Sequence, residues 1–167
     1  DSAIEVRGVV RGAIYHNTIV GASPYTAFRL TYGNNAAGGQ SGNQQITISD
    51  NLVIHTAPNP MMYAWNDGNI GSFSVGPQLW AGLFKQYEPN GLPTFPQKFD
   101  VRISRYDVAG IVRNPSHEGL TGLDDARSRY ALTARSPALG NASGLTRTLF
   151  DAVGEARSKS PSLGALE

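Results

Sequence analysis

The sequence contains no cysteine, carries little net charge and has no long apolar run. Without cysteine there is no disulfide framework, no thiolate nucleophile and no cysteine-based metal site. A formal net charge of +1 on 167 residues gives no electrostatic reason to expect nucleic acid or an anionic membrane as a partner. No apolar stretch approaches the roughly 18 residues that a membrane-spanning helix needs. These absences leave a folded domain of ordinary composition, with 40% apolar and 16% charged residues.

Motifs for zinc and for phosphate are also missing. The histidines His16, His55 and His117 show neither HxH nor HExxH spacing, so a zinc site is not expected. The glycine pair at 38–39 lacks the lysine and the following helix of a phosphate-binding loop. We therefore expect no nucleotide chemistry and no resident metal. Ca²⁺ stays open as a cofactor, although no motif indicates it.

Glycine and proline, by contrast, are plentiful, with 19 and 10 residues, and strong helix formers make no long run. This composition predicts many turns and therefore many short strands. The chain also repeats itself: the stretch 46–69 has the pattern of 14–35, and the repeat places Asn51 on Asn17, 34 residues earlier. Each copy holds two short alternating strands around a polar Asn, then a proline-containing bend and another strand. Units of this kind bury their apolar side chains only by stacking, which predicts a parallel β-solenoid.

The Asn at the bend of each copy has a predicted role of its own. In stacked coils, an Asn at a tight bend tolerates unusual backbone angles and hydrogen-bonds to its equivalent in the next coil. Asn17 and Asn51 are therefore expected to form a ladder. In a third coil, within SFSVGPQLWAG, Gln78 takes this position 27 residues after Asn51, so the Asn of the bend is not kept there.

Three segments are predicted to form successive rungs of one strand. They begin at Ala3, Ala27 and Met61, and the first two align at an offset of 24. Because side chains alternate between the faces of a strand, one set points inward and the other outward. The inward set is Ile4, Val6, Phe28, Leu30, Met62 and Ala64. The outward columns, which form the candidate surface, are Glu5, Arg29, Tyr63 and Arg7, Thr31, Trp65.

We expect one domain with two regions. Residues 1–82 form the coils, with the polar, glycine-rich stretch 34–45 as a loop inserted between two of them. That loop either walls a binding groove or is a surface insertion without function. Residues 83–167 form the last irregular coils and a C-terminal cap, because an open stack end exposes apolar core and unpaired strand edges. Inside this region, acidic residues followed by arginines predict a short helix over 123–130.

The C-terminal part carries a recognisable pattern: a leucine, a spacer, SPALG, an Asp…Gly…Arg stretch and a GAxE ending. The residues concerned are Leu132, Ser136, Pro137, Ala138, Leu139, Gly140, Asp151, Gly154, Arg157, Gly164, Ala165 and Glu167. Together with HNTIV, DNLVI and QLWAG, this pattern resembles the closing coils of secreted right-handed parallel β-helix proteins of the pectate-lyase-like superfamily.

The resemblance implies a right-handed parallel β-helix that is secreted or displayed at the cell surface. It also implies the C-terminal part of a longer helix, because members usually have more coils than this chain shows. The preceding coils are then missing, or a partner chain supplies them. The superfamily includes lyases, hydrolases, epimerases, adhesins and phage tail proteins, so the resemblance does not fix an activity.

A polysaccharide lyase of this type would neutralise a uronate carboxylate with arginine or Ca²⁺ and remove the adjacent proton with a basic side chain. Arg29 and Arg7 are the candidates for carboxylate contact, since guanidinium groups hold carboxylates bidentately, and Tyr63 is the candidate acid. The substrate-binding candidates are Glu5, Thr31, Trp65 and Asp67. A hydrolase instead needs two carboxyl groups about 5 to 9 Å apart. Glu5 and Asp67 are expected two rungs apart, at about 10 Å, which makes that chemistry marginal.

Each candidate has a structural alternative. As neighbours on adjacent rungs, Glu5 and Arg29 also make an ordinary surface ion pair of little energetic consequence. Tyr63 and Trp65 offer flat faces on which sugar rings lie, yet either can turn inward as core. Two function classes therefore remain open. One is a carbohydrate-active protein that binds an extended polysaccharide, with lyase-type β-elimination if it is catalytic; the other is a non-catalytic adhesin, surface or fibre-like assembly module.

Overall fold

The computed structural model describes residues 2–21, 26–31, 33–34, 40–55, 61–65, 73–81, 101–103, 110–143 and 150–166. The chain is β-rich, as its composition predicts. Its strands are β1 (Ser2–Arg7), β2 (Gly12–Tyr15), β3 (Thr18–Val20), β4 (Thr26–Thr31), β5 (Gly33–Asn34), β6 (Gln40–Ser41), β7 (Ile46–Ser49), β8 (Asn51–Ile54), β9 (Met61–Trp65), β10 (Phe73–Val75), β11 (Gln78–Ala81) and β12 (Val101–Ile103), and its helix is α1 (Leu123–Tyr130). In the described ranges, no helix has the length and apolar character needed to cross a membrane.

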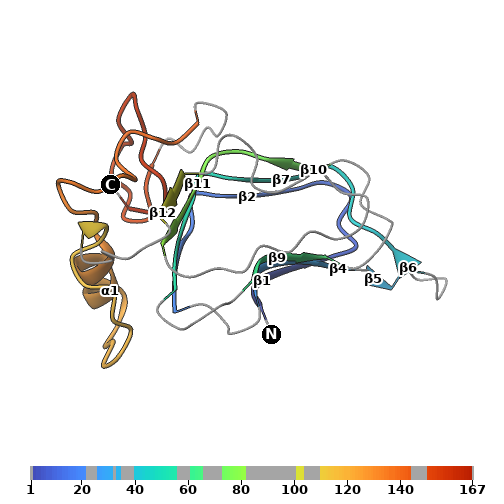
Figure 1. Ribbon diagram of the computed structural model, residues 1–167, viewed down its shortest axis with the longest axis horizontal. Coiled ribbons are helices and arrows are strands. Elements are labelled where there is room, and N and C mark those ends of the chain that lie inside the picture. Colours follow the sequence, from blue (N-terminus) through green and yellow to red (C-terminus); the bar gives the residue numbers. More distant parts are fainter. Residues whose placement is uncertain are drawn as a thin grey trace.

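Most strands belong to three parallel sheets, which we call A, B and C. Sheet A has the order β1-β4-β9, sheet B has β2-β7-β10, and sheet C has β3-β8-β11-β12. Along the chain the strands enter the sheets in the order A, B, C three times, and we call each set of three strands a pass. Figure 1 shows the three sheets around a common interior. The repeated segments thus pair in parallel, as the sequence predicts.

The registers of sheets B and C follow the sequence repeat. Ile14 pairs with Ile48 in sheet B. In sheet C, Asn51 pairs with Gln78, which is the alignment predicted for the third coil. The alignment of the repeated segments in the sequence therefore predicts the registers of sheets B and C correctly.

Sheet A agrees with prediction in its first register and departs from it by one residue in its second. Glu5 pairs with Arg29, as predicted. On β9, however, Ala64 pairs with Arg29, at the position predicted for Tyr63. The predicted alignment of β9 on β4, which placed Tyr63 on Arg29, is therefore wrong by one residue.

The interior between the sheets is apolar, and all three sheets contribute to it. Its buried residues are Ala27, Phe28, Leu30, Ile46, Ile48, Val53 and Trp80. The rings of Phe28 and Trp80 meet edge to face, with centroids 5.8 Å apart and an interplanar angle of 86°. This geometry is favoured because the positive ring edge meets the negative ring face.

A ladder of side-chain amides joins the bends between sheets B and C. The side-chain amide and the backbone N–H of Asn17 both donate to Asn51 Oδ1, at 2.9 and 3.0 Å. Asn51 donates in the same way to Gln78 Oε1, at 3.0 and 3.1 Å. His16 and Asp50, which precede the two asparagines, have φ of 54° and 58°, a conformation that His and Asp adopt more readily than most residues. The predicted ladder between Asn17 and Asn51 is confirmed, and Gln78 continues it at the bend position predicted for the third coil.

The stretch 34–45, predicted as an inserted loop, is partly structured. Strands β5 and β6 pair antiparallel, and Figure 1 shows this hairpin projecting from one corner of the molecule. Asn43 is buried and accepts a hydrogen bond from Val9 N–H at 2.9 Å. Its amide group donates to the carbonyls of Val6 and Thr31, at 3.2 and 3.0 Å. The end of the stretch therefore fastens the corner between sheets A and B, rather than forming a solvated loop.

The C-terminal segment packs against the outer face of sheet C. Leu52, Ile54 and Leu79 alternate with the interior residues Val53 and Trp80, yet all five are buried. The outer set contacts Ile111, Val112, Ala138 and Leu163 of the C-terminal segment. Coverage on both faces explains why β8 and β11 read as the buried runs NLVI and QLWA. The described part of the C-terminal segment lies beside sheet C (Figure 1).

Candidate functional site

The candidate surface is the outer face of sheet A, where four of the predicted residues lie on β1 and β4. Glu5 pairs with Arg29, and Arg7 pairs with Thr31, so the four occupy one face in two adjacent files. Their side chains point outward because they alternate with interior residues such as Phe28. The side chain of Arg7 is 64% exposed, and those of Arg29 and Glu5 are 29% and 26% exposed.

One carboxylate serves both arginines of this surface. Glu5 Oε1 lies 3.1 Å from Arg7 Nη2 and 3.7 Å from Arg29 Nε. Ion pairs as exposed as these contribute about 0–1 kcal/mol to stability. The structure therefore shows the surface ion pair foreseen as the alternative for Glu5 and Arg29.

The aromatic residues of β9 do not fall in the files of this patch. Tyr63 pairs with Phe28, and Trp65 pairs with Leu30, and both partners are buried interior residues. The predicted columns therefore lose their third members. The alignment of β9 on β4 was mispredicted because MMYAW is apolar at nearly every position, so alternation alone does not distinguish its two faces.

The chemical capacity of the patch follows from its groups: two guanidinium groups, one carboxylate and one hydroxyl. Guanidinium binds a carboxylate through two parallel hydrogen bonds, so the patch suits an anionic ligand. Among the described residues of this patch, Glu5 supplies the carboxyl group; Asp67, the other predicted one, lies outside the described residues. Nor does any group of three or more His, Cys, Asp or Glu gather as a metal site within the described ranges.

A buried polar contact that the sequence did not predict ties the C-terminal segment to the second pass. Ser143 donates to Asp50 twice, from its backbone N–H to Oδ1 at 2.6 Å and from its hydroxyl to Oδ2 at 2.8 Å. Nearby, Gly164 N–H donates to the Asp50 carbonyl at 2.8 Å, and Ala165 N–H donates to Thr18 Oγ1 at 3.0 Å. Asp50 is fully buried, so this contact stabilises the fold and offers no surface to a ligand.

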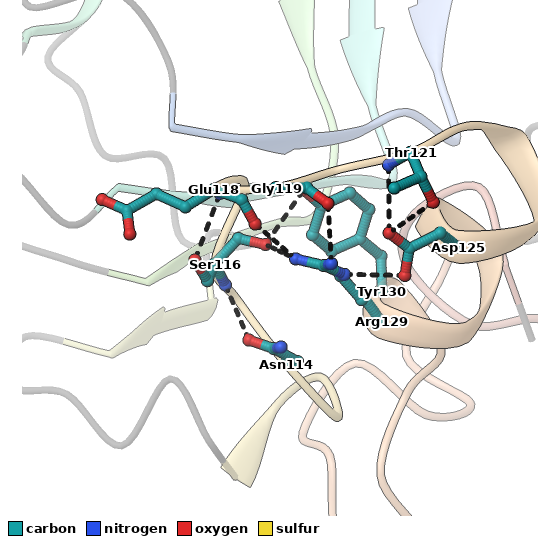
Figure 2. Close-up of polar contacts among 8 residues, drawn as sticks. All are labelled: Asn114, Ser116, Glu118, Gly119, Thr121, Asp125, Arg129 and Tyr130. Carbon is teal, nitrogen blue, oxygen red and sulfur yellow. Dashed lines mark hydrogen bonds and ion pairs between the residues drawn. The ribbon is translucent and has the colours of Figure 1, made fainter.

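A second charged cluster lies at α1, which spans the residues predicted for it. Figure 2 shows Arg129, in the last turn, reaching back to the loop before the helix. Its Nη1 donates to Glu118 O at 2.7 Å, its Nη2 to Gly119 O at 3.1 Å, and its Nε to Asp125 Oδ1 at 2.8 Å. One guanidinium thus fixes the loop against the helix, a clamp that we call the α1 clamp.

The α1 clamp shifts the pKa values of Asp125 and Arg129. The hydrogen bond from Arg129, followed by that from the backbone N–H of Thr121, holds the pKa of the Asp125 carboxyl below its ordinary value of 3.8. Reciprocally, the hydrogen bond to Asp125 raises the pKa of Arg129. Arg129, Asp125 and the loop carbonyls form hydrogen bonds with one another, and we therefore assign the clamp a structural role.

Comparison with known proteins finds no matching family model, no matching curated protein and no matching solved structure.

Proposed function

We propose that the chain forms coils of a right-handed parallel β-helix of the pectate-lyase-like type. The repeated order of sheets A, B and C supports this arrangement, as does the amide ladder at the bends. The right hand is supported by the rule that parallel crossovers are right-handed in about 98% of cases. The SPALG and GAxE pattern adds the family resemblance, and with it a secreted or cell-surface location.

We further propose that the outer face of sheet A binds an extended polysaccharide that carries carboxylates. The observation that carries this proposal is the arrangement of Arg7 and Arg29 around the carboxylate of Glu5. Ion pairs between partly exposed groups are weak, so an anionic ligand can compete with Glu5 for these guanidinium groups. Neighbouring strands lie about 4.8 Å apart, so a linear polymer running across the strands meets these polar groups in succession.

The described residues supply binding more readily than cleavage. Lyase-type β-elimination needs a basic group within hydrogen-bond reach of the abstracted proton. Tyr63, the predicted acid, pairs with Phe28 instead of Arg29, which removes it from the file of the patch. Cleavage of a uronate-containing glycan by β-elimination is therefore the catalytic form of the proposal, and it depends on groups beyond Glu5, Arg7 and Arg29.

The test is binding of the full chain to polygalacturonate and to a neutral glucan, measured by affinity electrophoresis or calorimetry. We expect retention by the acidic polymer, reduced about tenfold or more in Arg29→Ala and Arg7→Ala because each removes charge-assisted hydrogen bonds. Arg113→Ala is the matched control, because Arg113 is an exposed arginine on a different part of the chain. Equal binding by all three variants would refute the proposed site.

The same samples test for catalysis. The unsaturated product of β-elimination absorbs in the ultraviolet, so the chain is incubated with a panel of uronate polymers, with and without Ca²⁺, and absorbance is followed. A rise that Arg29→Ala abolishes supports lyase activity. A flat trace across the panel, with binding retained, leaves a binding protein without lyase activity.

The second candidate, a non-catalytic assembly module, is favoured by the incomplete burial of the first pass. Ile4 and Ile14 are only half-buried, whereas their register partners Phe28 and Ile48 are fully buried. A stack with such an end is completed by further coils, either preceding ones or those of a partner chain. This class of function predicts association with polypeptide and no dependence of binding on Arg29.

A further inference from the structure

The two arginines on the outer face of sheet A point at one oxygen rather than at two separate positions. Arg7 approaches Glu5 Oε1 through Nη2, at 3.1 Å, and Arg29 approaches the same oxygen through Nε, at 3.7 Å. The two arginines lie on neighbouring strands, β1 and β4, and are offset along them, because Arg29 pairs with Glu5 while Arg7 pairs with Thr31. Their guanidinium groups therefore converge on a single point from diagonal positions.

The carboxylate at this point is held loosely. Within the described part of the chain, neither arginine forms with Glu5 the two parallel hydrogen bonds by which guanidinium holds a carboxylate most strongly. Glu5 is tethered to the same face of β1 as Arg7, two residues before it, which restricts the orientations of its carboxylate. A carboxylate on a separate molecule has no such tether. The side chains of Glu5, Arg29 and Arg7 are 26%, 29% and 64% exposed, so a ligand reaches all three.

We infer that Arg7 and Arg29 form a clamp for one carboxylate of the ligand, and that Glu5 occupies this clamp when no ligand is bound. The inference rests on the proposed glycan site and specifies its ligand, because one uronate carboxylate fills the clamp. On binding, the ligand carboxylate replaces that of Glu5, which turns toward solvent. Glu5 thus acts as an intramolecular competitor that sets the affinity of the site.

The convergence of the arginines decides how many ligand carboxylates the clamp takes. A site for consecutive uronates would present its arginines separately, each facing its own carboxylate. Here both guanidinium groups contact one oxygen, so two ligand carboxylates placed there would lie side by side and repel each other. A glycan whose carboxylates are isolated, or partly esterified, is therefore expected to bind almost as well as a fully charged one.

The experiment measures binding of the full chain to one trisaccharide in three forms, by calorimetry. Trigalacturonate is used with all carboxylates free (triacid), with one free and two methyl-esterified (monoacid), and with all esterified (triester). The monoacid should bind within about threefold of the triacid, because additional equivalent carboxylates give only a statistical advantage to a site that takes one. The triester should bind at least about tenfold more weakly than the monoacid, since it lacks the charge-assisted hydrogen bonds.

Glu5→Gln tests the competitor directly, because it removes the charge and keeps the size of the side chain. Affinity for the monoacid should rise about two- to fivefold, the range that loss of a weak, partly exposed ion pair allows. Glu155→Gln is the matched control, because Glu155 is exposed on the C-terminal segment and its substitution changes the net charge equally. That variant should bind as the unmodified chain does.

Each contrary result has a distinct meaning. If the triacid binds and the monoacid is weaker by more than the statistical factor, the site needs several carboxylates; the clamp is then wrong and the glycan proposal stands. If Glu5→Gln fails to strengthen binding, or Glu155→Gln strengthens it equally, Glu5 is not the competitor. If no form of the trisaccharide binds, the glycan proposal itself fails, and the clamp fails with it.

Discussion

Asp50 and Ser143 stand 93 residues apart in the sequence and are joined by two hydrogen bonds, at 2.6 and 2.8 Å, to the two oxygens of one buried carboxylate. The contact holds the C-terminal segment against the bend of the second pass. It joins the C-terminal segment, which has no sequence repeat, to the repeated strands.

Asp50→Ala should destabilise the chain by about 2–3 kcal/mol, because Ser143 loses both acceptors in a buried site. Ser143→Ala removes only the hydroxyl donor and should cost about 1 kcal/mol. Asp50→Asn, which tolerates the positive φ and keeps one acceptor oxygen, should fall between them. Urea unfolding monitored by tryptophan fluorescence gives the three values, and a cost for Asp50→Ala no larger than that for Ser143→Ala would contradict the assignment.

Position along the amide ladder should decide the cost of breaking it. Asn51→Leu removes the oxygen that accepts from Asn17 and the buried amide that donates to Gln78, and should destabilise by about 2–4 kcal/mol. Asn17→Leu, at the start of the ladder and only half-buried, should cost about 1 kcal/mol. Chemical denaturation of the two variants checks the order, and equal costs would show that the ladder does not act as a connected series.

Gly164 fits a space in which a side chain does not. A Cβ at Gly164 would lie 2.6 Å from Thr18 Oγ1 and 3.1 Å from Leu52 Cβ, and its φ is +94°. Gly154 has a similar φ of +85° with nothing within 4 Å, so Gly154→Ala isolates the backbone strain, about 1–2 kcal/mol. Gly164→Ala should add a further cost of about 1–3 kcal/mol from overpacking. Thermal unfolding compares the pair, and similar melting temperatures would show that the segment shifts freely.

The α1 clamp predicts a defined pH dependence. Because the folded chain lowers the pKa of Asp125, its contribution to stability is present above the ordinary pKa of 3.8 and is lost as the pH falls through the lower folded value. Arg129→Gln removes the largest cause of the shift and should move the Asp125 titration upward, toward its ordinary range. Carboxyl chemical shifts followed by NMR from pH 6 to pH 2 report this directly.

In the clamp experiment, Arg127→Gln is the matched control. Arg127 pairs with Asp124 at 3.1 Å on the same helix and makes no bond to Asp125. Arg127→Gln should therefore leave the pKa of Asp125 unchanged. An equal upward shift in both variants would mean that general charge, rather than the Arg129 hydrogen bond, sets the pKa.

The repeat made much of the sheet pairing predictable from sequence. Asn17, Asn51 and Gln78 mark equivalent bends, and the apolar alternation around them fixes the registers of sheets B and C. In sheet A, Glu5 and Arg29 were placed side by side correctly for the same reason. The register of β9 was not predictable, because MMYAW offers apolar residues to both faces and its connection differs in length from the preceding one.

What the sequence could not show depends on contacts between distant or irregular segments. Asn43 belongs to a polar, glycine-rich stretch whose composition is that of a solvated loop, yet its amide is buried at a corner of the sheets. Ser143 and Gly164 lie in segments without periodicity, so no pattern points to their partners. The helix over 123–130 was predictable, because its charge order is a local signal.

The coverage of sheet C has a geometric consequence for any neighbour of this protein. The C-terminal segment packs its apolar residues on the outer face of sheet C and forms hydrogen bonds to Asp50 and Thr18, so this face is already covered. Exposed positions remain on the other two flanks, for example Glu5 on sheet A and Ser74 on sheet B. A neighbour that approaches sheet C therefore meets the C-terminal segment rather than the strands themselves.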